Sequence, residues 1–175
     1  MPPTIRPGKP ADARGLVRLH AASSTGTLQG RFLRPVAALT AAEALSLLSP
    51  QGGFSLVTER DDAIAGIITV VPRPHDPEVA EAGLWVGDPW HGKGIGTSLL
   101  VAAARSAASA GYQEMMITVL PTNRAVMPMV NAAGLRARVS TREGRTYVAF
   151  SLASLRNGRR APVVTSGTPG SGGTA

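Results

Sequence analysis

The sequence of 175 residues contains no cysteine. This absence excludes a disulfide framework, a thiolate zinc site and a cysteine nucleophile together. Aromatic residues make up only 4% of the chain, so the stacking platforms that bind single-stranded nucleic acids are scarce. No apolar run approaches the roughly 20 residues of a membrane span, and the opening MPPTIRPGKPAD lacks the apolar segment of a signal peptide. We therefore expect a cytoplasmic protein without a membrane partner.

Acidic residues are also few, since 11 of them face 18 basic residues and the net charge is +7. Taken alone, this surplus suggests a nucleic-acid-binding module, which would be retained on DNA in a strongly salt-dependent way. The surplus is uneven, however. Residues 134–175 hold seven arginines and a single glutamate, whereas the first 133 residues carry eleven basic and ten acidic groups. Because the main body is nearly neutral, we expect no nucleic-acid partner.

The length fits one domain of ordinary size. Twelve of the eighteen residues from Gly158 to Ala175 are Gly, Pro, Ser or Thr, a composition that favours disorder. We expect a catalytic domain over residues 1–155 and a disordered tail over residues 156–175.

Hydrophobic periodicity predicts a mixed α/β domain. Thr40 and Glu43 form a capping box that starts one helix, whereas residues 24–39 and the proline-rich stretch 72–78 are predicted as loops. The other predicted helices cover 11–23, 97–110 and 124–133, the last with Thr122 as its N-cap, and the predicted strands cover 4–6, 54–59, 63–71, 79–87, 114–120, 135–141 and 145–152.

A glycine-rich loop, His91-Gly92-Lys93-Gly94-Ile95-Gly96-Thr97, lies between a predicted strand and a predicted helix. Glycines at such a point allow several backbone N–H groups and the positive helix end to converge on one anion, such as a pyrophosphate. The loop is not a Walker A motif, because Gly94 follows Lys93, and it does not match the dinucleotide fingerprint. A turn that merely reverses the chain is the alternative.

The loop resembles the diagnostic Gln/Arg-x-x-Gly-x-Gly/Ala motif of the GCN5-related N-acetyltransferase (GNAT) family. The resemblance extends over residues 4–152 and includes Asn123 and the ending Asn131-Ala-Ala-Gly134-Leu135. It implies an α/β (α+β) GNAT fold, in which about four helices flank a mostly antiparallel sheet of about seven strands that is splayed between strands 4 and 5. It also implies acetyl-CoA as co-substrate, with no metal. The residues that it implies for binding acetyl-CoA are Leu84, Trp85, Val86, His91, Gly92, Lys93, Gly94, Ile95, Gly96, Thr97 and Asn123.

Two positions depart from the family pattern. His91 replaces the usual Gln or Arg, which leaves a backbone cradle intact. Val130 stands where many relatives have the tyrosine that protonates the departing CoA thiolate, and neither Tyr112 nor Tyr147 occupies that place. Water or another donor would then protonate the thiolate, or the thiolate would leave without a proton donor.

Residues 80–90 and the segment Gly30-Arg31-Phe32-Leu33 resemble bacterial protein-lysine acetyltransferases that modify acyl-CoA synthetases. This resemblance implies Glu81 as the catalytic general base. A lysine ammonium has a pKa of about 10.4, so it needs such a base before it can attack a thioester. From the residues alone, Glu81 is a solvated strand glutamate, and Arg31 and Arg34 lie in a solvated loop, although either could contact an acceptor protein.

The leading hypothesis is therefore an acetyl-CoA-dependent N-acetyltransferase that modifies a lysine ε-amine in proteins such as acyl-CoA synthetases. Direct transfer in a ternary complex is consistent with the lack of cysteine. The alternatives are an N-acetyltransferase acting on a small-molecule amine, and a non-catalytic acyl-CoA sensor. His20 and His75 are interpreted as packing or surface residues, because no second metal ligand stands at a suitable spacing.

Overall fold

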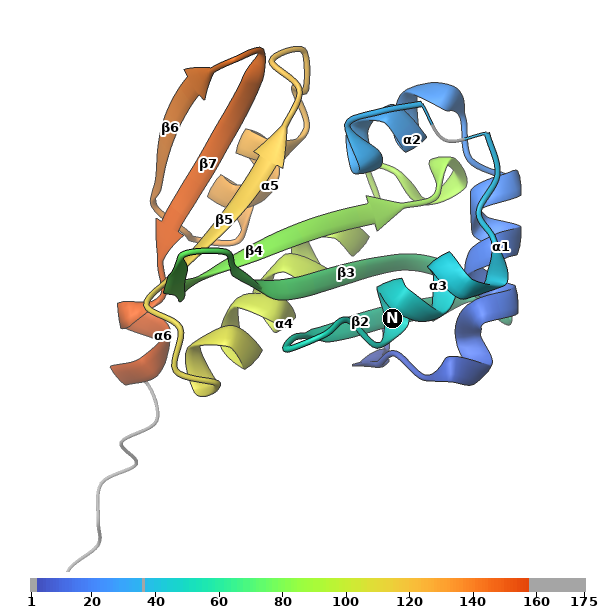
Figure 1. Cartoon of the computed structure of the whole chain (residues 1–175), viewed down its shortest axis with the longest axis horizontal. Coiled ribbons are helices and arrows are strands. Elements are labelled where there is room, and N and C mark those ends of the chain that lie inside the picture. The colour runs from blue at the N-terminus through green and yellow to red at the C-terminus, as the bar shows by residue number, and fades with distance from the viewer. Residues whose placement is uncertain (1–2, 36, 158–175) are drawn as a thin grey trace, which may run out of the picture.

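The protein is built around a seven-stranded sheet, seen in a computed structural model that describes residues 3–35 and 37–157 (Figure 1). The strand order is β1-β2-β3-β4-β5-β7-β6. Every neighbouring pair is antiparallel except β4 and β5, which run parallel. The strands are β1 (Ile5–Pro7), β2 (Phe54–Arg60), β3 (Ala63–Arg73), β4 (Asp76–Val86), β5 (Glu114–Val119), β6 (Ala137–Arg142) and β7 (Arg145–Ser151). The expected number of strands and the mixed sheet are confirmed.

Helices cover both faces of the sheet. On one face α1, α2 and α3 surround a core that includes Ile67 and Trp85. On the other face α4 and α5 pack over a larger core, which α6 extends at one end. Their bounds are α1 (Ala13–Ala21), α2 (Thr25–Phe32), α3 (Ala41–Leu48), α4 (Ile95–Ser109), α5 (Val126–Ala132) and α6 (Ala153–Asn157), with short 3-10 turns η1 (Pro10–Asp12) and η2 (Asp88–Trp90).

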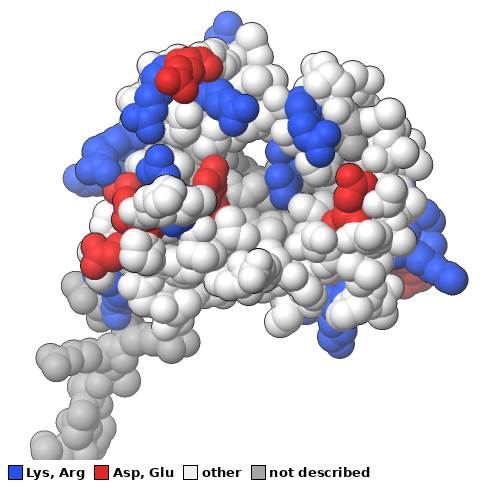
Figure 2. Space-filling view, in the orientation of Figure 1, with Lys and Arg blue, Asp and Glu red and all other residues white. Residues whose placement is uncertain are grey.

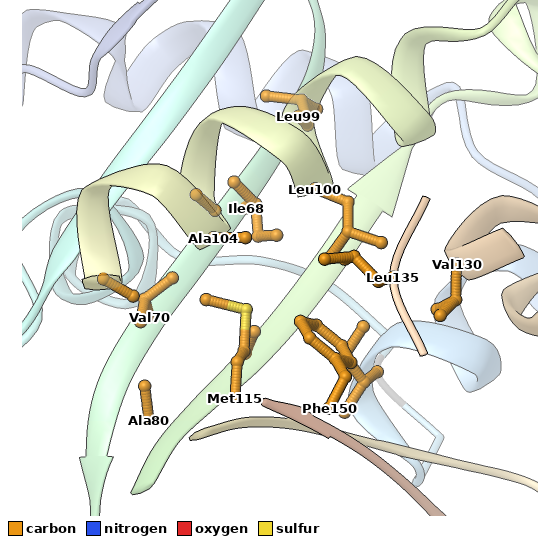
Figure 3. Packing of buried hydrophobic residues seen from close by; sticks show 14 of the residues in the cluster. Ile68, Val70, Ala80, Leu99, Leu100, Ala104, Met115, Val130, Leu135 and Phe150 are labelled. Carbon is orange, nitrogen blue, oxygen red and sulfur yellow. The ribbon is translucent and has the colours of Figure 1, made fainter. Parts of the chain in front are cut away.

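The larger core owes its close packing to the small side chains of α4. Leu99, Leu100 and Ala104 face the sheet (Figure 3) and are fully buried. Alanine is the strongest helix former, and alanines at 103, 104, 107 and 108 bring the helix near Ile68 and Met115. Each large apolar side chain buried here contributes roughly 1.5–3 kcal/mol to the free energy of folding. This packing holds α4, and with it the glycine loop at its start, against the sheet.

Three local predictions were wrong. Residues 24–39 were expected to be a loop, yet Ser24 caps α2 by accepting a hydrogen bond from the Thr27 N–H at 3.3 Å. Within the described residues there are six α-helices rather than about four, because α2 and α6 were not anticipated. The stretch 72–78 is mostly strand, since β3 and β4 turn tightly through His75, whose φ is 65°. The turn needs only one left-handed residue, and Pro72 sits beside the register shift, where a proline is tolerated.

Other observed element boundaries differ from the predicted ones by a few residues. Helix α4 begins at Ile95 rather than Thr97, so the last glycine of the loop lies in its first turn. The capping box at Thr40 is confirmed: the Glu43 N–H donates to Thr40 Oγ1, and Glu43 Oε2 accepts from the Thr40 N–H. Of the expected disordered tail 156–175, the first two residues close α6, and residues 158–175 lie outside the described residues. No helix in the described part of the chain is long and apolar enough to cross a membrane.

The sheet opens where its parallel pair ends. β4 and β5 are paired only from Val79 with Glu114 to Ala82 with Ile117. Beyond that point β4 runs on toward α2, while β5 turns away with β7 and β6 (Figure 1). The expected splay between strands 4 and 5 is therefore confirmed. It leaves one edge of the last residues of β4 without a neighbouring strand.

Candidate functional site

A cleft of about 770 Å³ fills the gap between the diverging strands. Its walls come from β4, the glycine loop, the start of α4, the end of β5, the start of α5 and one side of α2. In the space-filling view the molecule is hollowed at the upper centre, between the α2 side and the β5–β7 side, and basic side chains stand on both rims (Figure 2). A smaller hollow of about 200 Å³ adjoins the cleft and shares Arg31, Gly83 and Thr118 with it.

The glycine loop forms the end wall of the cleft. Gly92 and Gly94 have φ values of 70° and 77°, in the left-handed region that residues with a Cβ avoid. An added Cβ on either would meet no atom within 4 Å, so both glycines border open space. Gly94 is the N-cap of α4 and provides no side chain to satisfy the first N–H groups of this 15-residue helix. Those N–H groups, on Ile95, Gly96 and Thr97, therefore remain donors at the positive end of a helix dipole.

Two predicted loop residues use their side chains elsewhere. The His91 ring lies 2.8 Å (Nε2) from the carbonyl oxygen of Val86, which ties the loop back to the end of β4. Lys93 Nζ lies 4.8 Å from the centre of the Trp90 ring, a cation–π distance, and Lys93 is the one predicted loop residue that does not line the cleft. Any contribution of this loop to anion binding rests chiefly on its backbone.

The predicted strand residues Leu84, Trp85 and Val86 line the cleft along the open edge of β4. Leu84 and Val86 pack against the α4 side of the sheet. The indole of Trp85 points the other way: it is 1% exposed, and its Nε1 donates to Ser23 Oγ at 3.2 Å. The backbone N–H and C=O of Trp85 pair with β3, so the open edge of β4 exposes the backbone groups of Leu84 and Val86, while the Trp85 side chain anchors α1 and α2.

Asn123 also lines the cleft, at the start of α5. Its Oδ1 accepts hydrogen bonds from the N–H groups of Ala125 and Val126 at 2.9 and 3.1 Å. The prediction that Thr122 caps this helix was wrong, because Ala125 is the N-cap residue and the N–H groups at the helix start donate to the Asn123 side chain. These hydrogen bonds leave the Asn123 NH₂ group available to a ligand. Pro128 occupies the first turn of the shortened helix, where its missing N–H costs no hydrogen bond.

Glu81 is partly buried in the smaller hollow rather than in the main cleft. Its Oε1 accepts a hydrogen bond from Thr118 Oγ1 at 3.2 Å, across the last paired stretch of β4 and β5. Glu81 and Gly83 are two residues apart, so they share the face of β4 that carries α1 to α3. The predicted base, Glu81, therefore lies beside the point where β4 and β5 separate, in the hollow that adjoins the main cleft.

A carboxylate clamp holds α2 over this region. Asp88, in η2 just before the glycine loop, accepts hydrogen bonds from the Ser24 N–H and Ser24 Oγ, both at 2.7 Å, and from Thr27 Oγ1 at 2.8 Å. Burial opposes ionisation of the carboxyl, but these donors outweigh it and lower the pKa of Asp88 to about 2. The N-terminus of α2 is thereby fixed to the same turn that starts the loop.

Sequence reasoning missed the contribution of α2 to the site. Thr27, Gly30 and Arg31 line the main cleft because the segment is a helix clamped by Asp88. The Ser24–Thr27 spacing is an N-cap signal that could have indicated this helix. That Gly83 lines both hollows could not be predicted in the same way, since it depends on how α2 crosses β4.

Val130, which the family resemblance matches to a tyrosine position, is fully buried in the larger core with Leu135 and Phe150 (Figure 3). No tyrosine lines the cleft within the described part of the chain. Residues 3–35 and 37–157 also contain no group of three or more His, Asp or Glu residues placed to hold a metal ion.

Comparison with known proteins agrees with this geometry. Residues 23–134 match the model of the acetyltransferase (GNAT) family. No curated protein matches the sequence, but many solved structures share the fold. The GNAT domain of S. lividans PAT superposes with a TM-score of 0.76 at 22% identity, covering 85% of this chain and 90% of that one.

Two further structures widen the range of activities found on this fold. Salmonella typhimurium YncA, solved with acetyl-CoA, has a TM-score of 0.70 at 18% identity and covers 86% of this chain and 94% of its own. Diaminobutyrate acetyltransferase EctA from Paenibacillus lautus, solved with its substrate and coenzyme A, has a TM-score of 0.65 at 16% identity, with coverages of 86% and 95%. At these identities the structures show a shared fold. The family match spans more than half of the chain, and with the splayed sheet and the glycine loop it establishes that this protein belongs to the GNAT family of acetyltransferases.

Proposed function

We propose that this protein is an acetyl-CoA-dependent N-acetyltransferase that modifies the ε-amine of a lysine in protein substrates such as acyl-CoA synthetases. The observation that carries the proposal is the juxtaposition, at one gap in the sheet, of an open strand edge, a helix N-terminus and a carboxylate. The likeness of the 30–33 segment and of the Glu81 region to protein-lysine acetyltransferases supports the choice of acceptor.

The residues of the cleft fit acetyl-CoA. The free N–H groups of Ile95, Gly96 and Thr97 would hold the pyrophosphate, and the Cβ-free loop at Gly92 and Gly94 leaves room for it. The unpaired edge of β4 at Leu84 and Val86, with the NH₂ group of Asn123, would hold the pantetheine arm. Bound in this way, acetyl-CoA supplies an activated acyl thioester.

Glu81 would deprotonate the acceptor ammonium. Thr118 Oγ1 donates to one carboxylate oxygen at 3.2 Å, which orients the group while the other oxygen has no hydrogen-bond partner among the described residues. A positioned carboxylate of this kind typically accelerates proton transfer about 10²- to 10⁴-fold. Since the sequence has no cysteine, direct attack by the amine is the simplest route.

The thiolate product would take its proton from water in the open cleft. Val130 cannot donate one, because it has no ionisable group and is enclosed in the core. The proposed mechanism thus differs at this step from that of relatives with a tyrosine at the same position.

A small-molecule amine is the second candidate acceptor. The hollow beside Glu81 is about 200 Å³, a size that suits an amino acid better than a folded protein surface. A screen of small amines alongside acyl-CoA synthetases separates the two. Transfer to one small amine with failure of every protein acceptor would replace the lysine proposal.

The proposal is tested by the variant Glu81→Gln, assayed by mass spectrometry of acetylated acyl-CoA synthetase and by titration calorimetry with acetyl-CoA. We expect kcat to fall at least about 100-fold, whereas acetyl-CoA affinity stays within about twofold. Glu78→Gln is the matched control, because Glu78 is exposed on the same strand and lines neither hollow. Equal rates in wild type and Glu81→Gln would remove Glu81 from the mechanism. Binding of acetyl-CoA without turnover on any amine would favour a sensor.

A further inference from the structure

The guanidinium of Arg31 lies directly against the backbone of β4. Arg31 is in the last turn of α2, and a Cβ added to Gly83 would fall 2.6 Å from Arg31 Cζ and Nη1 and 2.9 Å from Nη2. Only a residue without a side chain leaves this space open. Gly83 follows Ala82, which is the last residue of β4 that pairs with β5. The guanidinium therefore sits where the two strands part.

Among the described residues, this charged group has no anionic partner. Its Nε is buried without a hydrogen-bond partner, and within residues 3–35 and 37–157 no carboxylate forms an ion pair with it. Its Cζ lies 5.2 Å from the centre of the Phe32 ring, a cation–π distance. By contrast, Arg6 pairs with Asp12 and Glu59. Arg31 is partly buried, and a buried Nε with an unused donor is costly, so an anion that uses the donors of the guanidinium offsets the cost.

Arg31 remains charged despite its surroundings. Burial lowers the pKa of Arg31 to about 10, so the group is still protonated at neutral pH. Arg31 lines both the main cleft and the smaller hollow, and Glu81 is the acidic residue of that hollow. The guanidinium therefore faces the space in which the acceptor amine would meet Glu81.

We propose that Arg31 binds a carboxylate carried by the acceptor close to the amine that is acetylated. The inference rests on the proposed function and narrows its substrate class. Five N–H donors in a planar fork match a carboxylate, and such pairs are often bidentate. Residues 81 and 83 are one strand repeat apart, about 7 Å, so amine and carboxylate would be separated by a similar distance. Two sources fit: an acidic side chain beside a target lysine, and the carboxylate of a free amino acid.

The test compares acceptors that differ only in this carboxylate. One arm uses Nα-acetyl-lysine and Nα-acetyl-lysinamide. The other uses amidated peptides in which Glu or Gln follows the lysine. We expect kcat/KM to be about 10- to 100-fold higher for the carboxylate form in one arm, which identifies the source. The preference should vanish in Arg31→Met, while KM for acetyl-CoA stays unchanged.

Three further variants keep the result interpretable. Arg34→Met is the matched control and should retain the preference, because Arg34 is exposed and lines neither hollow. Gly83→Ala should reduce the preference by displacing the guanidinium, even if Arg31→Met folds poorly. Arg31→Lys should retain part of it, because the charge is kept but the fork is lost.

Several results would overturn the assignment. Equal losses for carboxylate and amide acceptors in Arg31→Met would mean a structural role. A raised KM for acetyl-CoA with the preference intact would place Arg31 in the co-substrate site. Activity on both acceptor forms without any wild-type preference would refute the carboxylate while leaving the proposed function standing. Failure to acetylate any amine would overturn both.

Discussion

Replacing Asp88 by Asn tests whether one carboxylate holds α2 in place. The carboxylate accepts three hydrogen bonds, from the Ser24 N–H, Ser24 Oγ and Thr27 Oγ1. An asparagine of the same shape keeps a single acceptor oxygen and turns an NH₂ group toward at least one donor. The substitution therefore removes the charge and breaks part of the clamp, with little change in volume.

The magnitude follows from the pKa. A folded pKa of about 2 against an ordinary value of 3.8 corresponds to about 2.4 kcal/mol at neutral pH. Because Asp88 is partly exposed, solvent screening reduces this contribution to about 1–2 kcal/mol. We expect Asp88→Asn to lower the free energy of unfolding by that amount in urea titrations at pH 7, followed by circular dichroism.

The pH dependence gives a second readout. Asp88 has a lowered folded pKa, so its contribution is complete above the unfolded value of 3.8 and is lost as the pH falls toward about 2. The stability difference between wild type and Asp88→Asn should therefore shrink between pH 4 and pH 2. Identical urea midpoints at pH 7, or a difference that does not change over this range, would refute the reasoning.

Two further predictions concern the glycine loop and the core. Gly94→Ala should cost about 1–2 kcal/mol of stability, because its φ of 77° is left-handed, and should weaken acetyl-CoA binding measured by calorimetry. Gly144→Ala, with a φ of 69° in the β6–β7 turn, should cost a similar amount without affecting binding; equal binding losses would contradict a specific cradle. Val130→Tyr should lower the melting temperature through overpacking of a fully buried site and leave kcat unimproved. A stable variant with raised kcat would show that a tyrosine reaches the thiolate.

Much of the sheet could be predicted, because its strands carry strong local signals. Four of the six residues in the run 114–119 are apolar and the run forms β5, and the turn Arg142-Glu143-Gly144 joins β6 and β7. The capping box at Thr40 was also predictable, since its two partners are three residues apart. Predictions of this kind depend only on contacts between sequence neighbours.

The acceptor side of the site was harder to predict, because it depends on distant contacts. Helix α2 has a weak apolar pattern, with Leu28 as its one buried residue, and its start is held by Asp88, more than sixty residues away. Likewise, the need for a glycine at position 83 follows only from the position of the Arg31 guanidinium, which fills the space that a Cβ would take. The backbone cradle could be predicted because glycines and a helix start are local, whereas the juxtaposition of Arg31 and Glu81 is a product of tertiary packing.

Two of the arginines in the basic C-terminal part of the chain lie on an edge strand of the sheet, β6. Among residues 3–35 and 37–157, β6 lies at one edge of the sheet and pairs only with β7, so in this part of the chain its outer N–H and C=O groups are open to pairing with another chain. Val139, 52% exposed, lies at the middle of this edge. Arg138 and Arg142 lie on the same strand, where Arg138 forms an ion pair with Glu114 and Arg142 lies over the Tyr147 ring. Charged side chains on an edge strand oppose edge-to-edge association. The arginines of this strand would thus act as protection against aggregation, a task distinct from ligand binding.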